Sequence, residues 1–114
     1  MSSIDASCDC GAVRLQIARA PEEVTDCNCT LCRRYGTLWA YYSPKDVQTP
    51  AGVTEIYKRN QKMIEFHRCK NCGCVTHWAA VYKGYDRMAI NARLLAPEVL
   101  ARARIHHFDG ANSR

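Results

Sequence analysis

Eight cysteines in three tight clusters constrain this chain more than any other feature of its sequence. The clusters read Cys8-Asp9-Cys10-Gly11, Cys27-Asn28-Cys29-Thr30-Leu31-Cys32 and Cys69-Lys70-Asn71-Cys72-Gly73-Cys74. The spacings C-x-C and C-x-x-C bring two sulfur atoms within reach of one metal ion. A glycine beside such a pair permits a tight turn whose backbone N–H groups can donate to thiolate sulfur. The clusters therefore predict a fold organised around bound metal.

The first and third clusters can complete one tetrahedral site between them. Cys8 and Cys10 supply one pair of sulfur atoms, and Cys69 and Cys72 supply another pair that is distant in the sequence. Four protein ligands leave no position for a substrate, so this spacing predicts a structural zinc. Such a site would tie the first strand to the middle of the chain.

The middle cluster offers only three ligands, Cys27, Cys29 and Cys32, within six residues. Three protein ligands and one exchangeable position are the usual arrangement of catalytic zinc. The spacing also permits an alternative in which Cys74 supplies a fourth sulfur, closes this site and makes both zinc ions structural. All-thiolate sites of this kind favour zinc over iron.

The cysteine usage is typical of a reducing compartment. The first seven residues lack the basic and apolar regions of a secretory signal, and the longest apolar runs, 38–42 and 78–82, are five residues each. A membrane-spanning helix needs roughly 20 apolar residues. We therefore predict a cytoplasmic protein without membrane association and with reduced thiols. Disulfide formation is the alternative, and it concerns mainly the middle cluster, whose three thiolates would be partly exposed.

The charge of the chain does not indicate a nucleic-acid-binding protein. The formal net charge is +5, but the cations are scattered along the sequence rather than gathered in one stripe. If seven cysteines bind two Zn²⁺ as thiolates, the formal charge falls to about +2.

Period-two alternation of apolar and polar residues dominates the segments between the clusters and is typical of half-buried strands. The 114 residues suit one domain, 1–114. Strands are predicted at 12–17, 37–42, 64–67, 75–82, 88–94 and 105–108, and one short helix is predicted at 97–103. The sequence therefore predicts an all-β domain with one short C-terminal helix.

Three segments, in this order, resemble the motifs of the glutathione-dependent formaldehyde-activating enzyme family, which also includes centromere protein V. They are Cys8-Asp9-Cys10-Gly11-Ala12-Val13-Arg14, Cys27-Asn28-Cys29-Thr30-Leu31-Cys32-Arg33-Arg34-Tyr35-Gly36 and Cys69-Lys70-Asn71-Cys72-Gly73. The late segments Ile90-Asn91-Ala92-Arg93 and Phe108-Asp109-Gly110 fit the C-terminal pattern of the family. The resemblance spans nearly the whole chain and implies a β-tent zinc-binding fold.

The resemblance also implies roles for the cysteines and a reaction. The implied ligands of the structural zinc are Cys8, Cys10, Cys69 and Cys72, and those of the catalytic zinc are Cys27, Cys29 and Cys32. The family's reaction is the condensation of formaldehyde with glutathione to S-hydroxymethylglutathione, classed as a carbon–sulfur lyase reaction in the reverse sense. Arg33 and Arg34 directly follow the middle cluster, and we predict that at least one pairs with a carboxylate of the thiol substrate.

Two other functions remain open from the sequence. One is a non-catalytic, zinc-stabilised binding module like centromere protein V, and the other is a redox or metal-buffering role for the exposed thiols. The fourth ligand of the second metal distinguishes the enzyme from the binding module. An exchangeable ligand favours the enzyme, and the sulfur of Cys74 favours the module. The aromatic run at 35–42 fits a core strand better than a pocket, and His67 and His77 lack ligand spacing.

Overall fold

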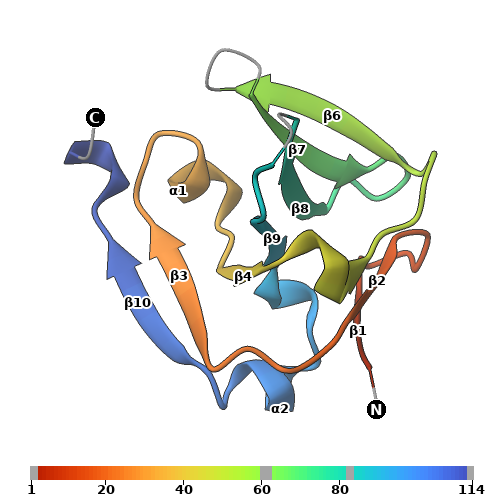
Figure 1. Ribbon diagram of the computed structural model, residues 1–114, viewed down its shortest axis with the longest axis horizontal. Coiled ribbons are helices and arrows are strands. Elements are labelled where there is room, and N and C mark those ends of the chain that lie inside the picture. Colours follow the sequence, from red (N-terminus) through yellow and green to blue (C-terminus); the bar gives the residue numbers. More distant parts are fainter. Residues whose placement is uncertain (1–2, 60–62, 82–83, 113–114) are drawn as a thin grey trace.

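Two β-sheets make up the part of the chain that the computed structural model describes, residues 3–59, 63–81 and 84–112 (Figure 1). The smaller sheet contains β1 (Ile4–Ser7), β2 (Arg14–Ile17) and β5 (Val47–Gln48), paired antiparallel in that order. The larger sheet has the order β10-β3-β4-β9-β8-β7-β6. Its strands are β3 (Glu23–Cys27), β4 (Trp39–Tyr42), β6 (Thr54–Arg59), β7 (Ile64–Cys69), β8 (Val75–Ala80), β9 (Met88–Asn91) and β10 (Arg104–Phe108). The all-β prediction is confirmed.

Short helical turns connect the strands. The α-helices are α1 (Cys32–Tyr35) and α2 (Pro97–Leu100), and the 3₁₀ turns are η1 (Pro44–Asp46), η2 (Ala92–Leu94) and η3 (Gly110–Asn112). Helix α2 corresponds to the predicted C-terminal helix, although it ends at Leu100 rather than at residue 103. Helix α1 was not predicted. None of the helices in the described ranges is long and apolar enough to cross a membrane.

All six predicted strands exist, with corrections at their ends: β2 begins at Arg14, β4 begins at Trp39, and β7 continues to Cys69. The strand predicted at 75–82 ends at Ala80, and Tyr82 lies outside the described residues. The strand predicted at 88–94 ends at Asn91, because the Asn91 side chain accepts a hydrogen bond from the Arg93 N–H at 3.1 Å and so caps the turn η2. The same side chain donates to the Val75 carbonyl at 2.8 Å, which ties β8 to the end of β9.

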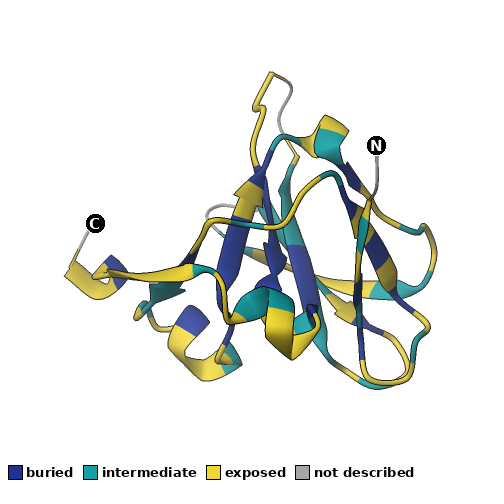
Figure 2. Cartoon of the chain, turned by 90° about the horizontal axis from the view of Figure 1, so that it is seen from below, coloured by how far each residue is buried: buried dark blue, intermediate teal, exposed yellow. Residues whose placement is uncertain are grey.

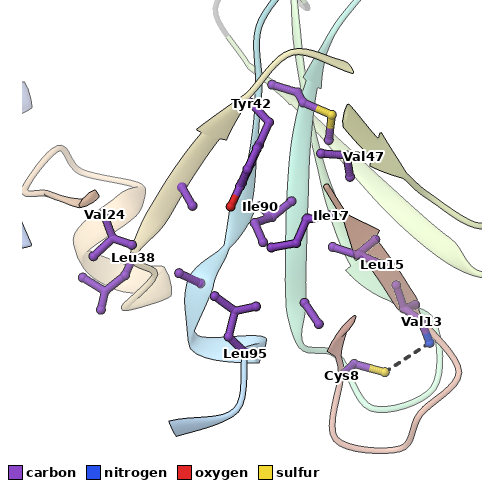
Figure 3. Close-up of a cluster of buried hydrophobic side chains, with 14 of the residues drawn as sticks. Cys8, Val13, Leu15, Ile17, Val24, Leu38, Tyr42, Val47, Ile90 and Leu95 are labelled. Carbon is purple, nitrogen blue, oxygen red and sulfur yellow. Dashed lines mark hydrogen bonds between the residues drawn. The ribbon is translucent and has the colours of Figure 1, made fainter. Parts of the chain in front are cut away.

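The main hydrophobic core lies between the two sheets (Figure 3). Leu15 and Ile17 from β2 meet Ile90 from β9, and all three side chains are 0% exposed. Burying a side chain of this size contributes about 1.5–3 kcal/mol. This burial of one face explains the period-two pattern at 12–17. Figure 2 shows buried residues, in dark blue, on strands of both sheets.

Strand β4 separates this core from a second, smaller apolar cluster. Its residues Ala40 and Tyr42 belong to the main core, whereas Trp39 packs with Phe66 and Ala89 in the smaller cluster. Because both faces of β4 are covered, the segment 37–42 is apolar on both faces, as predicted for a central strand. The smaller cluster lies against the middle cysteines and forms the floor of the site described below.

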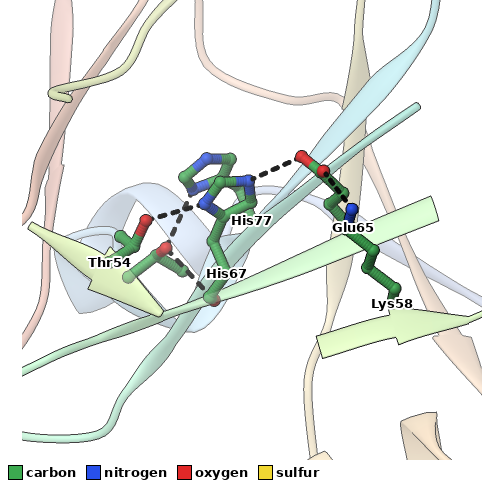
Figure 4. Close-up of polar contacts among 6 residues, drawn as sticks. Thr54, Lys58, Glu65, His67 and His77 are labelled. Carbon is green, nitrogen blue, oxygen red and sulfur yellow. Dashed lines mark hydrogen bonds and ion pairs between the residues drawn. The ribbon is translucent and has the colours of Figure 1, made fainter. Parts of the chain in front are cut away.

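A stacked pair of histidines joins β7 to β8 (Figure 4). The rings of His67 and His77 lie 4.2 Å apart at an angle of 13°. The Nδ1 atom of His67 is hydrogen-bonded to Thr54 Oγ1 at 2.7 Å, and that of His77 to Thr76 Oγ1 at 2.8 Å. Burial, with a smaller effect of the neighbouring His67, lowers the pKa of His77 to about 3. His77 therefore stays neutral in the folded protein at mildly acidic pH.

When the pH falls from 7.5 to 5, we expect the free energy of unfolding to decrease less in a His77→Gln variant than in the parent protein. The folded-state pKa of about 3 lies below the ordinary value of about 6.5, so the contribution of the neutral ring is fully present above pH 6.5 and declines as the pH falls toward 3. Urea unfolding at the two pH values should show a difference between parent and variant of about 1–2 kcal/mol. His107→Gln, on the exposed strand β10, is the control, and an unchanged pH dependence in His77→Gln would contradict this account.

Candidate metal centres and the adjoining cavity

The first cysteine group gathers Cys8, Cys10, Cys69 and Cys72, with all four sulfur atoms within 4.8 Å of one another. The sulfur atoms of Cys8 and Cys10 are 3.7 Å apart, and those of Cys10 and Cys69 are 3.6 Å apart. Four sulfur atoms placed tetrahedrally at roughly 2.3 Å from one zinc ion are about 3.8 Å apart. The spacing of this group therefore fits a closed tetrahedral zinc site.

Backbone N–H groups surround the sulfur atoms of this group. The Val13 N–H donates to Cys8 Sγ at 3.3 Å, and the Asn71 N–H donates to Cys69 Sγ at 3.4 Å. Two glycines with positive φ shape the loops, Gly11 at 83° and Gly73 at 80°, in a conformation that residues with a Cβ rarely adopt. Donors aimed at sulfur stabilise thiolates, the form in which cysteine binds metal.

Cys74 lies with this first group and not with the middle cluster. Its carbonyl accepts a hydrogen bond from the Cys69 N–H at 2.9 Å, and its side chain, like that of Cys72, packs against the main core. Backbone N–H groups, that of Cys74 foremost and then that of Cys10, lower the pKa of the Cys72 thiol to about 6. The alternative in which Cys74 closes the second site therefore does not fit the structure. All eight cysteines are free thiols here.

The second group contains Cys27, Cys29 and Cys32, with sulfur atoms again within 4.8 Å of one another. Cys27 ends β3, Cys32 begins α1, and Cys29 lies in the turn between them. Gly36 caps the end of α1, and its φ of 69° lets its N–H donate to the Cys32 carbonyl. The three sulfur atoms therefore come from one short segment of the chain.

Three donors from different elements reach the sulfur atoms of the second group. The Cys32 N–H donates to Cys29 Sγ at 3.3 Å, and the Arg59 guanidinium on β6 donates to the same atom at 3.6 Å. The Trp39 indole N–H donates to Cys32 Sγ at 3.3 Å. The turn, β4 and β6 therefore all help to hold the sulfur atoms in place.

These surroundings give the thiols different acidities. Burial alone would raise the pKa of Cys29, but hydrogen bonds from the Cys32 N–H, the Cys32 thiol and Arg59 outweigh it and lower the pKa to about 6. Burial raises the pKa of Cys32 to about 12, although the Trp39 donor opposes this rise. A bound dication removes the proton of a coordinating thiol outright. Binding of a cation at this group would therefore convert Cys32 to a thiolate.

A C-terminal segment closes over the turn that carries the second group. Asn28 Nδ2 donates to Asp109 Oδ1 at 3.0 Å, and Asn28 Oδ1 accepts from the Ala111 N–H at 3.0 Å. Gly110 is buried directly against the turn, and a Cβ at this position would lie 2.6 Å from Cys27 Sγ. Only glycine fits in this place without moving the sulfur.

Replacing Gly110 by alanine is expected to weaken zinc binding at the second group about tenfold or more, because the added methyl group must displace Cys27 Sγ from its present position. Competition with a chromophoric zinc chelator should show one weakened site and one unchanged site. Ala111→Ser, at the exposed neighbouring residue, is the matched control. Two unchanged sites in Gly110→Ala would mean that the sulfur moves aside at no cost.

The three sulfur atoms of the second group line a cavity of about 390 Å³. The remaining walls are mostly aromatic and apolar, and Arg59 is the charged residue among them. The other lining residues are Trp39, Tyr41, Ile64, Phe66, Trp78, Tyr85, Phe108 and Gly110. Both tryptophans of the chain are therefore in the wall of this cavity.

The structure does not place the two predicted substrate-binding arginines in this wall. Arg33 and Arg34 are both exposed, and the Arg34 guanidinium donates to the Thr30 carbonyl at 2.7 Å. The arginine that lines the cavity is Arg59, which also donates to Thr30 Oγ1 at 2.9 Å. Its position depends on how β6 lies relative to the turn, so nothing in the spacing of the sequence points to it.

The aromatic run at 35–42 divides between core and cavity. Tyr42 belongs to the main core, and Tyr35 packs against Phe66 with ring centroids 5.9 Å apart. Trp39 and Tyr41 line the cavity, although Trp39 is only 1% exposed. The expectation that this run is core is therefore only half right.

The sequence was compared with models of known protein families. The family model of the glutathione-dependent formaldehyde-activating enzyme matches residues 3–110. The chain belongs to this family. The match covers both cysteine groups and Gly110, so the family resemblance inferred from the sequence is confirmed.

A solved structure gives independent support for the fold. The crystal structure of a Rhodobacter sphaeroides protein superposes with a TM-score of 0.72 at 22% sequence identity, covering 90% of this chain and 100% of that chain. At this identity the likeness shows the fold alone. No curated protein matches the sequence significantly.

Proposed function

We propose that this member of the family binds two zinc ions and acts as a carbon–sulfur lyase on the adduct of glutathione and formaldehyde. The observation that supports this proposal most is the position of Cys27, Cys29 and Cys32 in the wall of a cavity of about 390 Å³. Among the described residues, no fourth cysteine, histidine or carboxylate joins this group. A metal ion held there would therefore keep one position open toward the cavity.

The two groups suit different roles for zinc. The first group supplies four sulfur ligands, which suits a structural ion, and the second supplies three, which suits a catalytic ion. When bound at the second group, zinc supplies a Lewis acid that favours the thiolate form of a ligand thiol near neutral pH. The reducing conditions of the cytoplasm, where we propose that the protein works, would keep all eight thiols available.

The proposed reaction forms one carbon–sulfur bond. The thiol sulfur of glutathione bonds to the carbon of formaldehyde, the π electron pair of the carbonyl moves to its oxygen, and that oxygen takes up a proton in place of the one lost by the thiol. The reverse reaction breaks the same bond and releases both reactants. No oxidant or reductant is needed in either direction.

The side chains around the sulfur atoms would offset charge and exclude water. Three thiolates carry more negative charge than one dication neutralises, and the Arg59 guanidinium beside Cys29 reduces the excess. The Trp39 indole N–H, in the floor of the cavity, holds Cys32 Sγ in place by a hydrogen bond. The aromatic walls surround the open position with apolar surface, which strengthens electrostatic interactions inside.

The experiment that tests this proposal is a rate measurement with the zinc-loaded protein. Exchange NMR with ¹³C-formaldehyde and glutathione should show faster formation and breakdown of the adduct than in protein-free buffer, at an unchanged equilibrium constant. The protein-free rate is an essential reference, because thiols add to formaldehyde unaided. Equal rates with and without protein would refute the enzyme and leave a zinc-stabilised binding module.

A further inference from the structure

A second cavity of about 340 Å³ adjoins the one that contains the cysteines. The two cavities share four wall residues, and we call them the inner lobe, with the three cysteines, and the outer lobe. The shared residues are Tyr41, Trp78, Tyr85 and Phe108. The outer lobe is completed by Thr25, Arg87 and His106. A ligand that begins at the sulfur atoms can therefore continue past the aromatic residues into the outer lobe.

Stacking on an aromatic ring orients the Arg87 side chain in the outer lobe. Its guanidinium carbon lies 4.1 Å from the centroid of the Tyr41 ring. Tyr41 is in turn held edge-on against Trp78, with the ring centroids 6.2 Å apart. A guanidinium stacked in this way keeps the N–H groups in its plane available for a carboxylate or phosphate.

The outer lobe has no negative charge of its own to neutralise Arg87. No aspartate or glutamate lines either lobe among the described residues, and no ion pair to Arg87 occurs there. The adjacent Asp86 accepts a hydrogen bond from the Ser43 hydroxyl at 2.6 Å. Burial raises the pKa of Tyr41, so its hydroxyl is uncharged at neutral pH. Arg87 also lines a neighbouring cavity that contains Glu22 and Glu23, and Glu23 is paired with Arg104 at 3.4 Å. The outer lobe itself is therefore a cationic site.

The two arginines of the combined cavity have different partners. Arg59 in the inner lobe is already bonded to Cys29 Sγ and Thr30 Oγ1. Arg87 contacts the face of Tyr41 and is an exposed residue. Of these two, Arg87 is the one whose hydrogen-bonding groups remain for a ligand.

We propose that the outer lobe binds a carboxylate of the thiol substrate and that Arg87 is the residue that selects for it. This inference rests on the proposed function, because it assumes that the thiol lies at the second cysteine group. Formaldehyde has only two non-hydrogen atoms and cannot reach from one lobe to the other. The carboxylates of an extended peptide thiol such as glutathione lie one to two residues from its sulfur, so they can lie in the adjoining outer lobe while the sulfur lies in the inner one.

Binding measurements with a charged and an uncharged thiol test the inference. Since both tryptophans line the inner lobe, their fluorescence reports on ligand binding without any reaction. The zinc-loaded protein is titrated with glutathione and with glutathione diethyl ester, whose carboxylates are blocked. We expect Arg87→Gln to weaken glutathione binding about fivefold to tenfold and to leave ester binding unchanged, and Arg87→Lys to recover part of the loss. Arg102→Gln, an exposed residue outside both lobes, controls for the change in net charge.

The Arg87→Gln titrations distinguish a carboxylate-binding role of Arg87 from a supporting one. Equal weakening of both ligands in Arg87→Gln would mean that Arg87 only supports the Tyr41 ring, and no weakening of glutathione would overturn the proposal. The adduct assay separates this inference from the proposed function. Glutathione binding that depends on Arg87 without any rate acceleration would retain the carboxylate site and refute the lyase.

Discussion

A Cys69→Ser variant is expected to lose one of two zinc ions and to be largely unfolded at 25 °C. Cys69 ends β7, is 2% exposed, and belongs to the group that joins the loop after β1 to the loop before β8. Zinc bound to four thiolates contributes on the order of 10 kcal/mol in small zinc domains, whereas small domains have a total stability of about 5–15 kcal/mol. Metal analysis and circular dichroism of protein purified under reducing conditions would measure both effects.

The same loop offers a matched control for this prediction. Cys74 lies beside Cys72 but is not one of the four grouped sulfur atoms, so Cys74→Ser should keep two zinc ions and a nearly unchanged unfolding midpoint. A Cys69→Ser protein with two zinc ions and the parent midpoint would show that the first group is not a structural metal site. Loss of zinc in Cys74→Ser would assign Cys74 as a ligand instead.

A Cys29→Ser variant is expected to remain folded, to bind one zinc ion and to show no rate above the protein-free reaction. Cys29 lies in the turn between β3 and α1, and the hydrogen bonds to its sulfur come from Cys32 and Arg59. Two remaining thiolates hold zinc far less tightly than three, whereas the main core between the sheets is not altered. Metal analysis, urea unfolding and the adduct assay on one preparation would measure the three effects together.

Two outcomes would contradict this second prediction. A Cys29→Ser protein that fails to fold would show that the second group is structural, like the first. A folded Cys29→Ser protein with full activity would show that the reaction does not depend on this group. Cys74→Ser again serves as the control for removal of a thiol outside the proposed catalytic group.

The strands were predictable from the sequence where one face is buried and the other is solvated. Leu15 and Ile17 of β2 and the preceding Val13 are all 0% exposed, so the alternation in the sequence is strict. Strands β1, β3, β5 and β6 were not predicted. Strand β6 lies at the edge of the larger sheet, where Ile56 and Tyr57 are 44% and 49% exposed. An edge strand with little burial leaves no periodic pattern to recognise.

The candidate metal groups were predictable because their ligands are close in the sequence. The turn from Cys27 to Cys32 brings three sulfur atoms together within one loop, and the glycines next to the other pairs allow the turns that those pairs need. The joining of the first and third clusters also followed from the requirement for four ligands. The assignment of these groups as structural and catalytic zinc sites stays a prediction.

The sequence by itself determined the family, the β-rich fold and the two cysteine groups, because short spacings and period-two burial are local properties of the chain. Only the tertiary structure decided that Cys74 lies beside the first group rather than in the second, that Arg59 lines the cavity where Arg33 and Arg34 do not, and that Arg87 lines the adjoining lobe. These residues lie many positions from the middle cluster in the sequence. Their approach to it depends on the pairing and curvature of strands across the larger sheet, which no local pattern specifies.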